Sequence, residues 1–183
     1  MPGFAGAAYP IFLGRVNRVG LHRPAVEALR RAAPWLALSV LLALLDQGSK
    51  FWVESAFQRG ERLPVTDFFN LVLVYNPGAA FSFLSDAAGW QRYALIAVSL
   101  IAVALISGLL ARQSSQGLFR IGLILILGGA LGNLWDRVAV GEVVDFLDFH
   151  LGAWHWPAFN VADSAISLGA MVLILDGFVG KKQ

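Results

Sequence analysis

The sequence predicts an all-α membrane protein with four transmembrane helices and a small interfacial β-segment on the outer face. Hydrophobic residues make up 57% of the 183 residues and charged residues only 14%, well outside the averages of soluble proteins. The mean hydropathy of +0.66 points the same way. Four segments approach the ~20 apolar residues that a helix needs to cross a bilayer. These observations predict one compact integral membrane unit.

The first 33 residues differ from the rest of the chain. Five arginines lie within residues 15–31, and Pro10 and Pro24 interrupt the apolar stretches. Residues 3–14 are too short and too rich in Gly and Pro for the core of a signal peptide. We therefore expect residues 1–33 to form a flexible basic leader on the cytoplasmic side.

One four-span domain is expected over residues 34–180. Three of its spans carry polar residues near an end, and only the second is free of charged residues. The third contains Gly128 and Gly132, a spacing of small residues that lets helices pack closely in lipid. The predicted spans are 34–53, 93–111, 118–135 and 161–180.

Residues 54–90 connect the first two spans and are expected on the outer surface. The run at 68–75 is rich in β-branched and aromatic residues, and Asn76-Pro77-Gly78 after it is a turn signal. We expect a short β-ribbon here, with its apolar side chains against the lipid headgroups. Several aromatic residues fit a belt at the same level: Trp90, Tyr93, Trp135, Trp154 and Trp156.

The basic residues orient the spans, because cytoplasmic loops carry an excess of Lys and Arg. With the N-terminus in the cytoplasm, nine of the fourteen Lys and Arg residues lie on the inner side. Both termini are then cytoplasmic. The polar residues of the first, third and fourth spans meet at the outer surface, where we expect a site.

Five carboxylates lie between Gly128 and Asp163, in a stretch that apolar spans flank on both sides. Acidic groups are costly next to hydrocarbon, so such a cluster indicates a functional site. The carboxylates are Asp136, Glu142, Asp145, Asp148 and Asp163.

Asp145 and Asp163 stand on either side of one predicted outer loop, so a fold can bring their carboxyls together. Two carboxyls in contact share a proton and titrate as a unit. The ionised one can take a proton from water while the protonated one polarises a peptide carbonyl. Structural interpretations compete: Asp163 fits the third position of a helix capped by Asn160, and Asp145 fits a solvated loop.

Other polar residues have supporting interpretations. Asp46 and Lys50 have the spacing of a helical ion pair. Arg137 can anchor loop carboxylates or satisfy backbone carbonyls. Asn76 and Asn133 can position backbone or substrate amides, although Asn76 fits a turn equally well.

Composition argues against other chemistries. The chain has no Cys, which excludes disulfides, thiolate nucleophiles and Cys metal sites. The three His residues lack the spacing of an HExxH motif, so neither a metal nor another cofactor is expected. The net charge of +2 gives no reason to expect nucleic acid.

Five short motifs occur in a fixed order: LDQGSK (45–50), YNPGAAFS (75–82), GGALGNLWDR (128–137), GEVVDFLDF (141–149) and FNVADS (159–164). In order and spacing they resemble the family of bacterial lipoprotein signal peptidases, also called signal peptidase II, which are four-span aspartyl proteases. The resemblance covers residues 34–180, and the longer leader before it departs from the family.

The resemblance implies that Asp145 and Asp163 are catalytic. It also implies a metal-free cleavage of a prolipoprotein just before its diacylglyceryl-modified cysteine, at the outer face of the bacterial inner membrane. The lipidated substrate and membrane lipid are the expected partners, and the protein is expected to be a monomer. The other matched positions around the site are Asp46, Lys50, Asn76, Gly78, Asn133, Arg137, Asn160 and Ala162.

Two other functions remain to be weighed. A proton or ion carrier would use the same carboxylates, but a relay needs polar groups at several depths and the middles of the spans have none. A structural subunit would need only the glycine-rich third span, which leaves the combination of FNVADS with VVDF unexplained.

Overall fold

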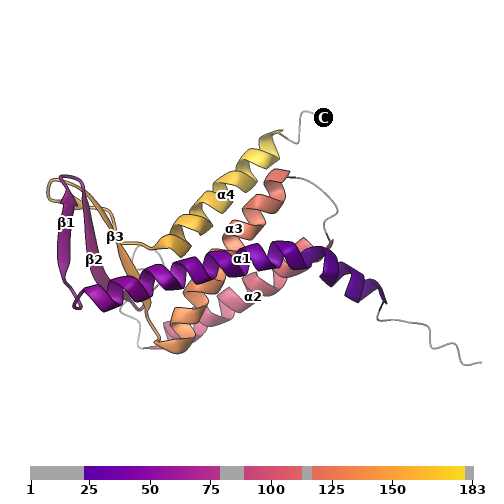
Figure 1. Cartoon of the computed structure of the whole chain (residues 1–183), viewed down its shortest axis with the longest axis horizontal. Helices are drawn as coiled ribbons and strands as arrows, with labels where there is room; N and C mark the ends of the chain where they lie inside the picture. The colour runs from indigo at the N-terminus through magenta and orange to yellow at the C-terminus, as the bar shows by residue number, and fades with distance from the viewer. Residues whose placement is uncertain (1–22, 79–88, 113–116, 180–183) are drawn as a thin grey trace, which may run out of the picture.

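The computed structural model describes residues 23–78, 89–112 and 117–179. Within these ranges, four helices are long and apolar enough to cross a membrane. They lie beside a small antiparallel sheet (Figure 1). The predicted fold class is therefore confirmed. The helices are α1 (Arg23–Ala56), α2 (Trp90–Arg112), α3 (Gly117–Ala139) and α4 (Val161–Val179).

The central helix is α3, which packs against each of the other three (Figure 1). Its glycines allow close approach: a Cβ at Gly128 would lie 2.7 Å from Leu42 of α1, and one at Gly122 would lie 2.6 Å from Leu173 of α4. Burial gives little driving force in lipid, so such close contacts hold the helices together. The close-packing role predicted for Gly128 fits this arrangement.

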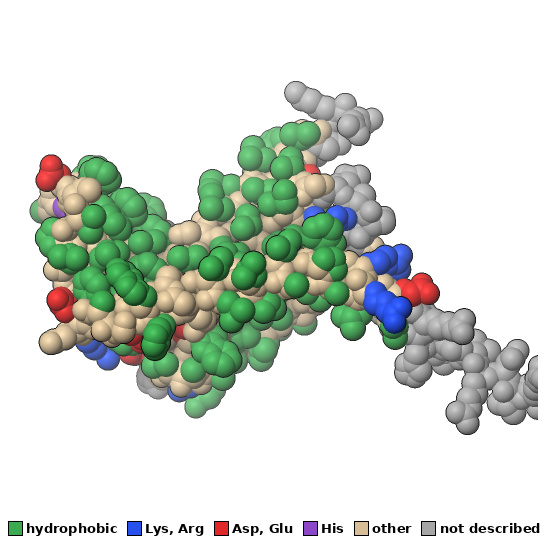
Figure 2. All heavy atoms as spheres, in the orientation of Figure 1, with side chains coloured by type: hydrophobic (Ala, Val, Ile, Leu, Met, Phe, Trp, Pro, Cys, Tyr) green, Lys and Arg blue, Asp and Glu red, His purple; other side chains and the backbone are tan. Residues whose placement is uncertain are grey.

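The outer surface of the bundle is apolar. Figure 2 shows hydrophobic side chains over the middle of the helices, with charged side chains gathered at the two ends. Exposed large side chains include Leu44 of α1, Ile101 of α2 and Phe178 of α4. A surface of this kind suits helices that are surrounded by lipid.

The sheet lies at one end of the bundle (Figure 1), and its strands follow the order β1-β2-β3-β4. Val53 of α1 packs against Leu73, Val144 and Phe146 of the sheet, which fixes the sheet on the helices. The start of α1 and the end of α4 both lie at the opposite end of the bundle. The strands are β1 (Arg62–Thr66), β2 (Phe69–Asn76), β3 (Val143–Leu151) and β4 (Trp154–His155).

The sheet is larger than the sequence predicts. The expected ribbon around residues 68–75 is β2, but the expected outer loop after α3 also forms the strands β3 and β4. The stretch VVDFLDFHL has the β-branched and aromatic residues of a strand. Gly141, with a φ of 99°, makes the turn from α3 into β3, a conformation that glycine adopts without a steric cost.

The first helix is longer than the predicted span. Residues 23–33, expected from the sequence to belong to a flexible leader, are instead helical and continuous with the rest of α1. Pro24 lies in the first turn, where the missing N–H costs nothing. Pro34 lies inside the helix and removes a hydrogen bond, and in Figure 1 the N-terminal part of α1 turns away from the remainder. Residues 1–22 lie outside the described part of the chain.

Candidate active site

One hydrogen-bonded network joins the ten site residues predicted from the sequence, where the bundle meets the sheet. They come from α1, β2, α3, β3 and α4 and from single residues next to β2 and α4, so distant segments of the chain build one site. The members are Asp46, Lys50, Asn76, Gly78, Asn133, Arg137, Asp145, Asn160, Ala162 and Asp163.

Asp145 is held on β3, opposite Val74 of β2, and is only 2% exposed. Asn76 Nδ2 donates to its Oδ2 at 3.0 Å, and Asn160 Nδ2 donates to its Oδ1 at 2.8 Å. Burial and the negative charge of Asp163 raise the pKa of Asp145 to about 7, because both favour the neutral acid. The aspartate pair (Asp145 and Asp163) therefore holds a proton near neutral pH.

Asp163 occupies the third position of α4. Its backbone N–H donates to Asn160 Oδ1 at 2.8 Å, so Asn160 is the N-cap that the sequence predicts. The side chain has a second task, because its Oδ1 accepts a hydrogen bond from Asn133 Nδ2 at 2.7 Å. The capping interpretation and the site interpretation thus apply to the same residue.

The side-chain nitrogen of Lys50, on α1, has a hydrogen-bond acceptor for each of its N–H groups. Its Nζ lies 2.7 Å from Asp46 Oδ2, 2.7 Å from Asp136 Oδ2 and 3.1 Å from Asn133 Oδ1. An ammonium has three N–H groups, and all three have acceptors here. The predicted ion pair with Asp46 is confirmed, and the three contacts hold the side-chain nitrogen in one position.

Hydrogen bonds to backbone groups join Asp46, Arg137 and Asn76 to the neighbouring elements. Ala162 N–H, in the first turn of α4, donates to Asp46 Oδ1 at 2.8 Å. Arg137 donates to the carbonyls of Asn133 at 3.2 Å and Gly78 at 2.9 Å, which is the carbonyl-binding role predicted for it. Gly78 N–H in turn donates to Asn76 Oδ1 at 3.0 Å, so Asn76 both forms the predicted turn and contacts Asp145.

Asp136 and Gln47 also belong to the network, although the sequence indicates no role at the site for either and places Asp136 only in the wider cluster of carboxylates. Asp136 Oδ2 accepts from the backbone N–H of Val144 at 3.3 Å, and its Oδ1 accepts from Gln47 Nε2 at 2.6 Å. These bonds fix β3 and α1 against α3. The spacing of Asp136 three residues after Asn133 places both on one helix face, which is the signal that identifies it.

No pattern in the sequence indicated that Arg92 would contact the residues of the site. Its guanidinium donates to the carbonyls of Arg137 and Val138 at 2.9 Å each. These carbonyls belong to the end of α3, where the last carbonyls lack partners within the helix. The side chain from the start of α2 thus fixes the end of α3, from which Asp136 and Arg137 project.

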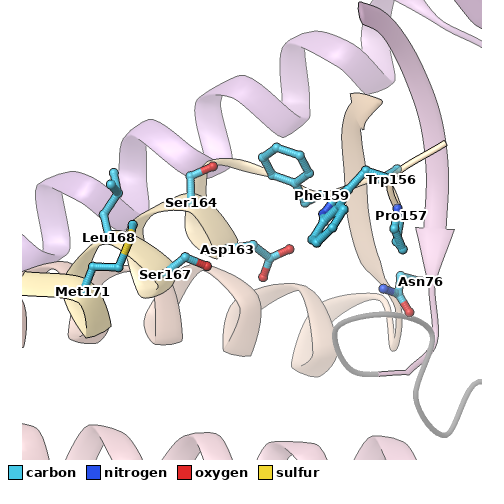
Figure 3. Close-up of a pocket in the computed structure, with 10 residues that line it drawn as sticks. Asn76, Trp156, Pro157, Phe159, Asp163, Ser164, Ser167, Leu168 and Met171 are labelled. Atoms are coloured by element: carbon cyan, nitrogen blue, oxygen red, sulfur yellow. The ribbon is translucent and has the colours of Figure 1, made fainter. Parts of the chain in front are cut away.

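A groove of about 440 Å³ opens beside Asp163 (Figure 3). The carboxyl of Asp163 points toward Phe159 and Asn76, between α4 and the aromatic segment that precedes α4. Most of the lining is apolar, and it continues along α4 to Met171. The lining residues are Asn76, Trp156, Pro157, Ala158, Phe159, Asp163, Ser164, Ser167, Leu168 and Met171.

A smaller cavity of about 130 Å³ gives access to Asp145. It shares Asn76, Pro157 and Ala158 with the larger groove, so the two carboxyls are reached from adjoining spaces. Among the described residues, no group of three or more His, Asp or Glu side chains could hold a metal ion. The arrangement suits a reaction in which two carboxyls exchange protons with a bound molecule.

Comparison with known proteins identifies the family. The model of the family described as signal peptidase (SPase) II matches residues 38–179. A lipoprotein signal peptidase of Burkholderia cenocepacia strain J2315 is 56% identical over 156 residues, which are 85% of this chain and 92% of that relative. One of Paraburkholderia phytofirmans strain PsJN is 56% identical over 144 residues, 79% of this chain and 84% of the relative.

Solved structures agree with this. A bacterial membrane enzyme determined by the in meso method at 2.3 Å resolution has a TM-score of 0.72 and 26% identity, covering 81% of this chain and 90% of that one. A second, at 1.9 Å resolution, has a TM-score of 0.67 and 28% identity over 78% of this chain and 91% of its own. The chain therefore belongs to the signal peptidase II family of aspartic-type peptidases.

Proposed function

We propose that this protein is an endopeptidase that removes the signal peptide from diacylglyceryl-modified prolipoproteins, with Asp145 and Asp163 as its catalytic pair. The observation that carries the proposal is the placement of two carboxyls, the buried Asp145 of β3 and the partly buried Asp163 of α4, in one amide-lined network beside an apolar groove. The relatives that are 56% identical bear the name lipoprotein signal peptidase. The alternative of a proton or ion carrier is not favoured by this family.

The reaction needs only the two carboxyls and one water molecule. The ionised carboxyl takes a proton from water, whose oxygen bonds to the scissile carbonyl carbon, while the protonated carboxyl gives its proton to the carbonyl oxygen. A tetrahedral diol results. When its C–N bond breaks, the first carboxyl passes its proton to the leaving amine and a diol hydroxyl returns a proton to the second. Both carboxyls are then in their starting states.

The groove suits the substrate class. A signal peptide is an apolar helix, and the lipid on the cysteine is apolar as well. An apolar lining that continues from Asp163 along α4 to Met171 can hold such a substrate next to the carboxyls. In this proposal the sheet end of the bundle faces outward from the bacterial inner membrane, both termini are cytoplasmic, and the enzyme works as a monomer among membrane lipids.

Turnover of a diacylglyceryl-modified prolipoprotein in detergent tests the function. Asp145→Asn and Asp163→Asn should each abolish cleavage, and the double variant should be about as inactive as either one, because groups that act as a unit are not additive. Asp176→Asn, on the same helix as Asp163 but outside the network, is the matched control. Near-normal cleavage by either well-folded site variant would contradict the mechanism, and loss of cleavage with a chelator would indicate a metal.

A further inference from the structure

The segment of residues 156–159 forms one wall of the groove beside Asp163. All four residues line the groove, together with residues of α4 (Figure 3). Pro157 and Ala158 also line the smaller cavity that reaches Asp145. The α4 wall is a regular helix, whereas residues 156–158 belong to no helix or strand. The shape of the groove therefore depends on what holds this segment in place.

The backbone holds the segment at its two ends. The N–H of Trp156 donates to the carbonyl of Phe149 at 2.8 Å, and the N–H of Phe159 donates to that of Leu147 at 3.1 Å. The preceding strand, β4, has only two residues and, within the described ranges, pairs with β3 alone. So short a hairpin is marginally stable through its own backbone bonds. Side-chain contacts of β4 are therefore needed to hold the segment against β3.

A polar cluster supplies such a contact, with one side chain from each of the four strands. Its centre is Asp148 of β3, which is only 3% exposed. Oδ1 of Asp148 lies 2.8 Å from Nδ1 of His155 of β4, and Oδ2 accepts from Asn70 Nδ2 of β2 at 2.8 Å. Nε of Arg62 of β1 lies 3.5 Å from the same Oδ2. The cluster thus joins β4 to the rest of the sheet.

The bond between His155 and Asp148 is charge-assisted. Burial favours the neutral acid, but the hydrogen bonds from His155 and Asn70 hold the pKa of Asp148 below its ordinary value, so Asp148 is ionised at neutral pH. A carboxylate only accepts, so Nδ1 of His155 carries the proton. Hydrogen bonds to ionised groups are stronger than those between neutral groups. The ring of His155 also stacks on that of His150, with centroids 4.8 Å apart, and is fixed in one orientation.

We infer that Asp148 and His155 are positioning residues that hold the 156–159 segment in place as a wall of the groove. His155 directly precedes Trp156, so a restraint on its ring restrains the start of the segment. Neither side chain lines the groove, so both act on a substrate only through the shape of this wall. The effect on substrate binding rests on the proposed function, whereas the fixing of the segment does not.

Two variants of His155 separate the hydrogen bond from the bulk of the side chain. His155→Ala removes the N–H that Asp148 accepts. His155→Asn retains an N–H at the δ position and can donate to the same oxygen. The side chain of His155 is 31% exposed, so both variants should fold.

Hydrogen exchange of the detergent-solubilised full chain tests the inference without substrate, because amide exchange reports local opening. In His155→Ala, the N–H groups of Trp156 and Phe159 should exchange about tenfold faster than in wild type. In His155→Asn they should exchange at nearly the wild-type rate. Exchange in α2 is the internal control and should be unchanged in both variants. Wild-type exchange of the segment in His155→Ala, or equal acceleration in both variants, would overturn the inference.

Cleavage kinetics with a diacylglyceryl-modified prolipoprotein test the effect on binding. His155→Ala should raise KM about tenfold and leave kcat within about twofold, because the wall binds substrate and transition state alike. His155→Asn should restore KM. Loss of folded enzyme alone would lower the maximal rate at unchanged KM, and that result would overturn the positioning role. If the wild-type protein does not cleave this substrate, the proposed function fails, and hydrogen exchange still decides whether the Asp148–His155 bond holds the segment.

Discussion

Lys50 Nζ lies 2.7 Å from Asp136 Oδ2 and thereby joins the first and third helices by a buried ion pair. The two side chains are only 2% and 6% exposed. Desolvating charged groups costs several kcal/mol, which a close pair repays only while its partners are complete. The contact therefore makes both the bundle and the site sensitive to changes at either residue.

Asp136→Asn should destabilise the protein by about 3–5 kcal/mol, the usual cost of removing one partner of a buried ion pair. A large fall in the unfolding temperature in detergent and a loss of cleavage are expected together. Glu142→Gln is the control, since the Arg59–Glu142 pair at 3.2 Å is largely exposed on the arginine side and such pairs contribute under about 1 kcal/mol. Equal unfolding temperatures for the two variants would refute this account of the network.

Asp145 should make the protein less stable as the pH rises. The pKa of an aspartate carboxyl is ordinarily about 3.9, and that of Asp145 in the fold is raised to about 7, so the folded state binds an extra proton between these values. Stability therefore falls as the pH rises from about 4 to about 7, by up to about 4 kcal/mol. Asp145→Asn cannot ionise and should lose most of this slope.

Unfolding temperatures measured in detergent from pH 4.5 to pH 7.5 check the slope. Asp67→Asn, in the exposed turn between β1 and β2, is the control and should retain the wild-type slope. If the curves of wild type and Asp145→Asn run parallel over this range, burial and the charge of Asp163 do not act on Asp145 as described.

Asp148 should have the opposite effect to Asp145 and make the protein more stable as the pH rises. Burial alone would raise its pKa, but hydrogen bonds from His155 and Asn70 and the charges of His155 and Arg62 hold it below the ordinary value. Such a carboxylate contributes stability above about pH 4, which is lost as the pH falls through the lowered pKa. Asp148→Asn should therefore unfold at a lower temperature at neutral pH.

The difference between wild type and Asp148→Asn should shrink as the pH falls below about 4. The measurement is the unfolding temperature of both proteins at neutral and acidic pH. A difference that grows toward low pH would contradict the sign of this argument. The exposed Asp67→Asn serves again as the control and should match wild type throughout.

The sequence alone was enough to predict the four spans and ten of the residues that the network joins. Hydropathy locates helices well in a membrane protein, because a span requires an unbroken apolar stretch. The ion pair of Asp46 with Lys50 and the cap at Asn160 depend on local spacing, which the sequence displays directly. These features are determined within one or two helical turns.

Features that depend on distant segments could not be predicted. Acidic residues within β3 suggested a solvated loop, whereas Asp145 and Asp148 face donors from β2 and from the segment before α4. Arg92 binds carbonyls 45 residues away. The orientation of Asn133 is set by Lys50, 83 residues earlier in the chain, and no local pattern records such a pairing.

The proposed topology places the turn between β3 and β4 outside the cell membrane and the segment after α2 inside. The chain contains no Cys, so single cysteines can report on each position. Ala153→Cys, in the exposed turn, should react with a membrane-impermeant thiol reagent in cells with a permeabilised outer membrane. Gln113→Cys should react only after the inner membrane is disrupted, and the reverse pattern would invert the topology.

Gly132 leaves space for the carboxylate of Asp46 in the wall between α1 and α3. A Cβ at this position would lie 2.5 Å from Asp46 Oδ2 and 3.4 Å from the Cβ of Ala162. Asp46 cannot give way freely, because Lys50 and the N–H of Ala162 hold both its oxygens. Gly132→Ala should therefore cost about 1–3 kcal/mol, the usual range for overpacking, and should reduce cleavage.

Gly108→Ala is the matched control for Gly132→Ala. Gly108 lies inside α2, and a Cβ there would have no atom within 4 Å. Alanine also favours the helix by up to ~1 kcal/mol over glycine, so the unfolding temperature should stay the same or rise slightly, with full cleavage. If Gly132→Ala matches Gly108→Ala in both unfolding temperature and cleavage, Asp46 is free to move, and the close contact of α1, α3 and α4 at Gly132 does not hold the site in place.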